Sequence, residues 1–416
     1  MNQSEAQNSA ATSEATPDFP VVWERPGDEH GFWERDQMHF PEPITLLDDA
    51  FVRIIFEHGF NHAARHYEMP IRGAARRIGT YMYQSMAPSL PPEQMAAQGK
   101  RTEERISPVI ARLGELWERE WLPELQRNLA EWRAFDLAGA LLPELLAHAD
   151  RTVERLRRVW EIHFEIAFPM LLAISLFDDF YRDLFGDEDA FQAYRLLQGF
   201  DNKTLETNRA IWTLSRRALA EPTVRRVFET LPAPEVVPAL EGTLAGRAFL
   251  TELRTFLEAY GRRGDSWGLR SPGWIEDPTS VIRNVKDYVA QPDRDLEAER
   301  AALVHERERL IRAARERLRG YPRPVVEQFE GLLESAQVGN VLSEEHGFWI
   351  DFGATYEVRL VFLELGRRFT AAGVLDRPED VFSLGLDEIR ATAEALPALD
   401  RRAVVAERRA EMERFA

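Results

Sequence analysis

The sequence predicts an all-α protein, predominantly helical, with an irregular N-terminal lead-in segment. The first supporting observation is spacing: from Leu46 onward the apolar residues mostly recur three or four positions apart, as in Val109, Leu113 and Leu116. The second is a set of Pro- or Gly-rich breaks that interrupt this pattern. The breaks lie at residues 87–92, 231–238 and 261–278. We therefore expect helical subdomains separated by Pro/Gly-rich breaks.

The expected elements follow in chain order. Residues 1–16 are rich in Ser, Ala, Asn and Gln and predict a disordered tail, whereas 17–45 contain Trp, Pro, Gly and His and predict an irregular lead-in. Residues 46–235 are expected to form one helical subdomain and 236–416 a second, which together make one unit. Residues 293–319 are a run of Glu, Arg and Ala that predicts an exposed helix.

Composition excludes several functional classes. The 416 residues include no Cys, which rules out disulfides, a thiolate nucleophile and Cys-ligated metal sites. A formal net charge of −18 opposes binding to nucleic acid, whose phosphates carry the same sign. No stretch approaches the roughly 20 apolar residues that span a bilayer, and residues 1–16 lack the apolar core of a signal peptide. We expect a cytoplasmic protein that binds neither nucleic acid nor membrane.

The pair Asp178 and Asp179 is the first candidate for chemistry. Paired acids on a helix can hold Mg²⁺, so a class I isoprenoid synthase-like enzyme that uses these two residues is one alternative. That chemistry requires a second metal-binding motif, and residues 201–206 do not match it. The favoured interpretation is a solvated helix end at which Arg182 neutralises its neighbours.

Three histidines, His58, His62 and His66, recur four positions apart, and adjacent members could chelate zinc from one helical face. Three imidazoles that span two turns of a straight helix cannot all reach one ion, however. We interpret them as polar-face residues and expect this chain to hold no metal ion.

His163 lies on a predicted buried stripe, between Trp160, Phe164 and Ala167. A lone histidine in a core is usually structural. The alternative is an imidazole in an aromatic-walled ligand pocket, where it could take part in proton transfer. The sequence around it leaves both interpretations open.

The densest polar cluster is 343–351, which the pattern places between two predicted helices. It contains three carboxylates, an imidazole and two aromatic side chains, the groups that a hydroxyl-activating site needs. Glu345 and His346 are the candidate catalytic residues. Asp351 could instead cap a helix that begins near Tyr356, and both roles can hold at once.

A series of short motifs runs through nearly the whole chain. They are Phe32-Trp33-Glu34-Arg35-Asp36 with His39-Phe40-Pro41, then 160–164, 197–206, Tyr260-Gly261-Arg262-Arg263-Gly264, 274–278, 344–351 and 380–384. In order and spacing they resemble the phosphoenolpyruvate synthase-like dikinases, which include rifampin phosphotransferase and phenylphosphate synthase. The resemblance is to the acceptor-binding helical region that lies between an ATP-grasp domain and a swivelling phosphohistidine domain.

The resemblance implies that this chain is the acceptor-binding subunit of an ATP-dependent dikinase. In that mechanism ATP phosphorylates a mobile histidine, and the phosphoryl group then passes to a hydroxyl held in the helical region. The chain has no Gly-rich phosphate loop and no phosphohistidine motif. An ATP-grasp subunit, with ATP and Mg²⁺, and a phosphohistidine domain would therefore act in trans, and the chain alone would bind no cofactor.

The same resemblance implies roles for individual residues. His346 or Glu345 would take the hydroxyl proton, and Arg359 or Arg263 would neutralise the transferring phosphoryl group. The acceptor would contact His163, Asp351 and an aromatic wall that suits the flat ring of a phenol better than another small hydroxyl compound; the wall is Trp160, Phe164, Phe168, Phe348 and Trp349. A catalytically inert helical ligand-binding or scaffold protein is the other alternative.

Overall fold

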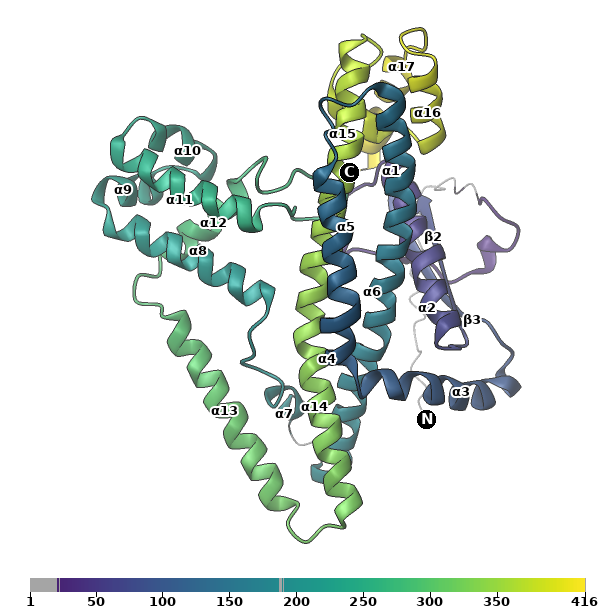
Figure 1. The fold of residues 1–416 in the computed structure, drawn as a ribbon, viewed down its shortest axis with the longest axis vertical. Helices are drawn as coiled ribbons and strands as arrows, with labels where there is room; N and C mark the ends of the chain where they lie inside the picture. Colours follow the sequence, from purple (N-terminus) through teal and green to yellow (C-terminus); the bar gives the residue numbers. More distant parts are fainter. Residues whose placement is uncertain (1–20, 22, 187–188, 190, 416) are drawn as a thin grey trace, which may run out of the picture.

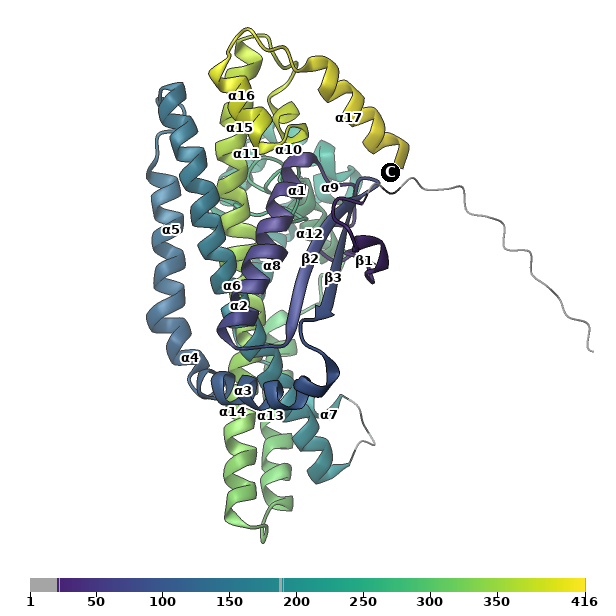
Figure 2. The same cartoon turned by 90° about the vertical axis from the view of Figure 1, so that its right-hand side faces the viewer.

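The computed structural model describes residues 21, 23–186, 189 and 191–415. The tail expected over residues 1–16 lies outside the described residues. The described chain is predominantly helical with a small sheet (Figures 1 and 2), so the predicted fold class is confirmed.

Long helices form the spine of the molecule (Figure 1). Helix α6 (Leu142–Phe185) packs against α14 (Arg323–His346), which continues through the π-helix η4 (Gly347–Ala354) into α15 (Thr355–Ala371). Gly339 on α14 allows this close approach, because a Cβ there would lie 3.0 Å from the Met170 carbonyl oxygen of α6. The main hydrophobic core lies along this contact and against the N-terminal helices.

Helix α6 also contains the one window in the described chain that is long and apolar enough to cross a membrane by composition. The sequence analysis had found no such stretch. Within the molecule 56% of that window is buried, and Trp160 and Ile162 are 1% and 0% exposed. Its apolar character is therefore explained by its place at the centre of the protein core.

A three-stranded antiparallel sheet flanks the spine (Figure 2). Strands β2 (Ile71–Ile78) and β3 (Tyr81–Pro88) form a hairpin, and β1 (Glu34–Arg35) pairs with the other edge of β3. Gly79 and Thr80 have φ values of 60° and 94°, as a tight two-residue hairpin turn requires. The sequence analysis expected helix from Leu46 onward and missed this hairpin, because β2 is rich in Arg and Ala and shows no clear alternation.

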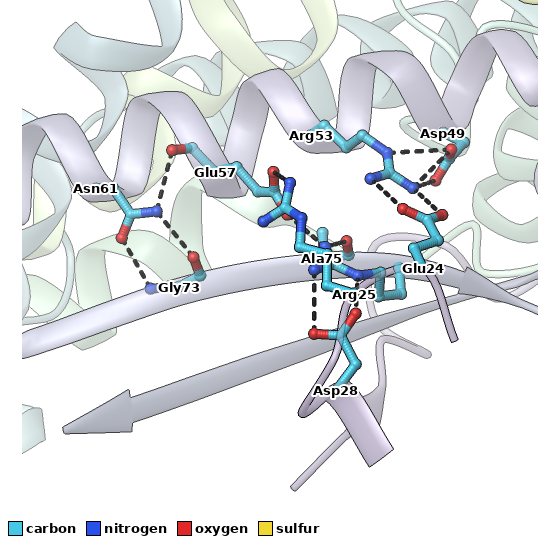
Figure 3. A network of polar contacts seen from close by, with 10 residues as sticks. Glu24, Arg25, Asp28, Asp49, Arg53, Glu57, Asn61, Gly73 and Ala75 are labelled. Atoms are coloured by element: carbon cyan, nitrogen blue, oxygen red, sulfur yellow. Dashed lines mark hydrogen bonds and ion pairs between the residues drawn. The ribbon is translucent and has the colours of Figure 1, made fainter. Parts of the chain in front are cut away.

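Buried polar contacts fasten the sheet to the π-helix η2 (Ile54–Phe60). Arg76 of β2 is 3% exposed, and its guanidinium pairs with Asp28 at 2.7 Å and with Glu57. Asn61, which begins α2 (Asn61–His66), donates to the Gly73 carbonyl at 2.8 Å and accepts from the Gly73 amide at 2.9 Å. Figure 3 shows these contacts, which fix the sheet and part of the lead-in against the helical body.

A lobe to one side of the spine packs around its own core, from Ile211 to Val289 (Figure 1). Its helices are α8 (Lys203–Ala220), α9 (Pro222–Thr230), α10 (Ala233–Glu241), α11 (Leu244–Tyr260) and α12 (Thr279–Val289). The boundary expected near residue 235 lies within α10, and the division of the chain into two subdomains stays a prediction. Pro234 occupies the first turn of α10, where its missing amide hydrogen costs no hydrogen bond.

The remaining elements surround the spine. Helix α13 (Leu296–Arg317) is the exposed helix that the charged run predicted. Helix α1 (Leu46–Arg53) begins with a capping box between Thr45 and Asp48. The others are η1 (Asp28–His30), α3 (Pro92–Ile110), α4 (Leu113–Leu116), η3 (Trp117–Trp121), α5 (Leu122–Ala134), α7 (Gln192–Arg195), η5 (Pro378–Ser383), α16 (Leu386–Glu394) and α17 (Arg402–Phe415).

Candidate functional site

Two histidines and an aspartate meet in the core of the spine. His163 comes from the middle of α6, His346 is the last residue of α14, and Asp351 lies in η4. One nitrogen or oxygen atom of each lies within 4.8 Å of the other two, and the three residues are 7%, 7% and 8% exposed. Among the described residues, no other group of three or more His, Asp or Glu side chains is placed closely enough to share a metal ion.

The π-helix explains how His346 and Asp351 come to face the same point. In an α-helix, residues five positions apart lie about 140° apart around the axis. A π-turn, with its wider i to i+5 repeat, brings such residues onto nearly the same face. The sequence analysis expected a break between two helices here, with Asp351 as a possible cap. That expectation was wrong, because α14, η4 and α15 form one continuous helical run.

The polar atoms of the cluster are only partly satisfied. His346 Nδ1 donates to the Leu342 carbonyl at 2.6 Å, so its Nε2 carries a free lone pair. His163 Nδ1 lies 3.0 Å from Asp351 Oδ1, but the angles do not suit a hydrogen bond, and neither buried atom has an aligned partner. Buried polar atoms without partners are rare in folded proteins and call for a functional explanation.

Burial and charge set the ionisation of this region. Burial lowers the pKa of His346, because the charged imidazolium would lose its hydration. Burial opposes ionisation of Asp351 as well, but the neighbouring imidazoles, His163 first, hold the pKa of that carboxyl below its ordinary value. The cluster therefore favours a carboxylate beside a neutral His346.

Aromatic side chains enclose the cluster. The His163 ring centroid lies 4.6 Å from that of Trp160, 4.7 Å from Phe164 and 6.2 Å from Trp267. Trp267 belongs to the loop between α11 and α12 and also stacks on His39 at 4.0 Å. The sequence analysis did not select Trp267 or His39, although both lie in or beside segments that it singled out, the 261–278 break and the 32–41 motif.

The loop over the cluster is held at its centre. Arg359 of α15, 4% exposed, donates to the Leu269 carbonyl at 2.6 Å and forms a bidentate ion pair with Glu276 at 2.9 and 3.1 Å. Asp48 accepts from the Leu269 amide at 2.7 Å. Arg359 is thus occupied in fixing the loop. The void that remains beside Asp351 under the loop measures about 10 Å³, no more than one water.

Arg263, the other candidate for phosphoryl binding, lies on the same loop. Its guanidinium stacks on Trp274 at 4.7 Å and Phe352 at 4.3 Å, its Nε has no hydrogen-bond partner, and no described carboxylate lies within ion-pairing distance. Burial lowers its pKa, and the nearby charges of Asp265, then Glu344 and Asp351, oppose that effect. Arg263 is therefore a half-buried cation that lacks a fixed anionic partner.

A cavity of about 300 Å³ opens beside Arg263, on another face of η4 from the cluster. Phe348 and Trp349 line it, and its wall carries charges of both signs, with Lys203 and Arg262 beside Glu206 and Glu258. Lys203 pairs with Glu206 at 2.7 Å. Arg263 lines this cavity, and it is also close enough to Asp351 for that charge to oppose the lowering of its pKa. It therefore lies between the cavity and the cluster.

The other candidates lie in different surroundings. Phe168 packs on Phe60 of η2 with ring centroids 5.1 Å apart, as a core residue. Phe164 contacts the same Phe60 ring at 5.4 Å in addition to His163. Glu345 turns towards α8, where its carboxylate accepts from the Lys203 amide at 2.9 Å, and burial raises its pKa. The structure does not bring Glu345 to the cluster.

The two rejected metal motifs are explained by ion pairs. Asp178 pairs with Arg182 at 2.7 Å near the end of α6, as the favoured interpretation expected. His58 lies 2.7 Å from Glu161, and His62 lies 3.2 Å from Glu165, so these histidines tie η2 and α2 to α6. Among the described residues, neither set gathers three ligand atoms closely enough around one point to share an ion.

Comparison with known proteins places this geometry in context. Residues 163–344 match the family described as the rifampicin phosphotransferase fourth domain. The chain is 41% identical over 382 residues to chondramide synthase of Chondromyces crocatus, covering 91% of this chain and 10% of that protein. It is 29% identical over 233 residues to an uncharacterised phosphotransferase, YvkC, of Bacillus subtilis, covering 55% of this chain and 27% of that protein.

A shorter match, 51% identical over 63 residues, relates the chain to an uncharacterised protein of Mycobacterium tuberculosis and covers 15% of this chain and 7% of that protein. The chain therefore spans roughly a quarter or less of each of these relatives. The phosphotransferase matches agree with the motif resemblance over residues 163–344, which begin with His163 and end just before His346 and Asp351. The chain contains a helical region of the phosphoenolpyruvate-utilising dikinase type.

Proposed function

We propose that this chain holds the acceptor in a phosphotransfer reaction, a small compound with a phenolic hydroxyl, at the cluster of His163, His346 and Asp351. One observation carries the proposal. A buried charged cluster with incompletely satisfied polar atoms begins at His163, inside the residues 163–344 that match a phosphotransferase domain, and is completed by His346 and Asp351 directly after them. A core gains no stability from such atoms, so a ligand that completes their contacts is the simplest reason for them.

The surroundings of the cluster favour an aromatic acceptor. Trp160, Phe164 and Trp267 present ring faces and edges around His163, against which a flat apolar ring can stack. The hydroxyl would then lie on the His346 Nε2 side of the cluster, where it meets either that lone pair or a group bound to it. Binding requires Trp267 and its loop to move, since the void beneath the loop admits no more than a water. Loop closure over a bound substrate would also keep water from the phosphoryl group.

Arg263 is suited to the phosphoryl group. Transfer between phosphate and a hydroxyl is catalysed chiefly by positioning and by neutralising charge on the phosphoryl oxygens. A cation that already has a carboxylate partner would have to break that pair first, and Arg263 has no such partner among the described residues. The 300 Å³ cavity gives an approach from the surface. Lys203 and Arg262 on its wall are paired with Glu206 and Glu357, which leaves Arg263 as the unpaired cation among its described lining residues.

The phosphoryl donor would come from partners. In the proposal an ATP-grasp subunit binds ATP and Mg²⁺, and a mobile phosphohistidine domain carries the phosphoryl group to this chain.

The test is reconstitution of transfer. The protein is purified from native extract with its partners, and ATP-dependent phosphorylation of a panel of phenols and aliphatic alcohols is measured. Arg263→Gln should lower turnover about a hundredfold. Arg133→Gln is the matched control, because Arg133 lines the same cavity but is paired with Glu357.

Three results would refute the proposal. Phenol binding without transfer by the assembled complex would indicate the inert binding protein. Turnover of an isoprenoid diphosphate that is lost in Asp178→Asn would indicate the isoprenoid synthase-like enzyme. Equal loss in Arg263→Gln and Arg133→Gln would show that the cavity needs only general positive charge.

A further inference from the structure

We infer that His163, His346 and Asp351 bind a divalent transition-metal ion, of the Zn²⁺ or Fe²⁺ type, through two imidazoles and one carboxylate. Such an ion was not expected from the sequence, in which the three residues lie on two segments almost 200 positions apart. The inference deepens the proposed function. The role of the ion rests on that function, whereas the binding of the ion does not.

The arrangement of the three side chains is the first argument. Their ligand atoms lie within 4.8 Å of one another. Bonds of about 2.0–2.1 Å to a shared ion place neighbouring ligand atoms about 3.0–3.4 Å apart. The 3.0 Å distance from His163 Nδ1 to Asp351 Oδ1 already lies in this range of ligand-to-ligand distances. A modest rotation of the His346 ring would bring in the third ligand.

The second argument is that the 3.0 Å contact between His163 Nδ1 and Asp351 Oδ1 does not have the geometry of a hydrogen bond. A protonated His163 beside Asp351 would be expected to point its N–H at the carboxylate, yet both atoms lack an aligned partner. A metal ion between the two atoms would accept a lone pair from each, so no N–H would need to point at the carboxylate. The same ion would give both buried atoms a shared partner in addition to each other.

The surroundings of His346 are the third argument. Metal-binding histidines usually donate their second ring N–H to a carbonyl or carboxylate, which fixes the tautomer and the ring orientation. His346 Nδ1 does so to the Leu342 carbonyl at 2.6 Å and leaves Nε2 free for an ion. His39 shows the same pattern with Asp36 at 2.8 Å and is the nearest further imidazole on the loop side.

The ligand set indicates the kind of ion. Imidazole nitrogen suits Zn²⁺ and Fe²⁺ and is a poor ligand for Mg²⁺ and Ca²⁺, which prefer oxygen. Two histidines and one carboxylate leave at least one coordination position open. The void lined by Asp351 lies on the loop side, where the acceptor is proposed to enter. Because the ion would occupy the Nε2 lone pair of His346, the acceptor oxygen would bind the ion in place of that lone pair, and the ion would favour the ionised form of the hydroxyl.

Metal binding can be measured without any activity assay. The chelator-treated protein is titrated with Zn²⁺ by calorimetry, its metal content is measured by mass spectrometry, and Co²⁺ is used as a spectroscopic probe. We expect one equivalent of Zn²⁺ and Co²⁺ visible absorption that Zn²⁺ displaces. Asp351→Asn, which keeps the side-chain shape, should bind Zn²⁺ more than tenfold more weakly.

The double variant His58→Ala/His62→Ala is the matched control, since it removes two partly exposed histidines away from the cluster. It should bind Zn²⁺ like the wild type. Failure of the wild type to bind Zn²⁺ and Co²⁺, or unchanged binding in Asp351→Asn, overturns the inference. The Co²⁺ spectrum of the wild type decides the matter even if Asp351→Asn does not fold.

Transfer is measured separately, in Mg²⁺, with chelated and with Zn²⁺-reloaded protein. Metal binding without transfer by either form refutes the proposed function and leaves the metal site standing. Equal transfer by both forms supports the proposed function and overturns the role of the ion.

Discussion

Replacing each of the two candidate arginines by Met should separate a structural role from a chemical one. Arg359 is 4% exposed and gives four hydrogen bonds, two to Glu276 and one each to the Leu269 and Arg270 carbonyls. Arg359→Met leaves all these acceptors without their donor. Arg263 gives no described hydrogen bond and lies on two aromatic rings, where the Met chain can also pack.

The magnitude follows from the buried ion pair. Removing one partner of such a pair typically costs about 3–5 kcal/mol. Glu276 is 26% exposed and keeps a hydrogen bond from the Gly273 amide, so we expect the lower end, about 3 kcal/mol. For a chain of 416 residues that corresponds to a fall in Tm of about 3 °C. Arg263→Met should change the free energy of unfolding by less than about 1 kcal/mol.

The assay is urea-induced unfolding of wild type and both variants, beside phosphoryl transfer by the reconstituted complex. Arg263→Met should keep stability and lose transfer about a hundredfold. Adding Glu276→Leu to Arg359→Met should recover part of the lost stability, because the unpaired carboxylate is removed. A stable Arg359→Met protein that loses transfer as completely as Arg263→Met would refute the assignment of Arg359 to the loop.

Three further changes test other parts of the structure. His148 is 3% exposed, and burial lowers its pKa to about 4, so the stability that its neutral form contributes should be complete above pH 6.5 and lost towards pH 4. Urea unfolding should show the free energy of unfolding fall by at most about 3 kcal/mol over this range, and His148→Leu should not show this fall. Gly59→Ala should cost about 1–3 kcal/mol, because its Cβ would lie 2.8 Å from the Trp160 carbonyl oxygen, whereas exposed Gly331→Ala should be neutral or stabilising in the same melts. Phe348→Ala should raise the acceptor KM about tenfold with little change in kcat if the ring lines the entry path.

The sequence predicted the helices where one physical signal dominates. Residues 296–317 form a helix because Glu, Arg and Ala favour one and few apolar side chains compete. The β2–β3 hairpin was not predictable in this way. Arg76 is buried in β2 only because Asp28 and Glu57, both distant along the chain, neutralise it. A strand that is stabilised by ion pairs to distant residues need not show the alternation of apolar and polar residues by which strands are predicted from sequence.

The sequence indicated which residues belong to the site, but it did not show how the fold brings them together. His346 and Asp351 stood out because polar residues are dense around them, and His163 because it interrupts an apolar stripe. The π-turn that brings His346 and Asp351 together has no sequence signature comparable to a helical period. The division between Arg263 and Arg359 was equally hidden, because a sequence does not show which guanidinium already has partners.

The loop from Gly261 to Pro278 connects these features in one argument. Its centre is fixed twice at Leu269, through Asp48 and Arg359. The part before that anchor carries Arg263 and Trp267, and it is the part that would have to move for an acceptor to reach His163. An anchor beside a movable segment lets the cover open without releasing the whole loop. Closure would return Arg263 to a position between the cavity and the cluster, so acceptor binding and charge neutralisation would be completed by the same motion.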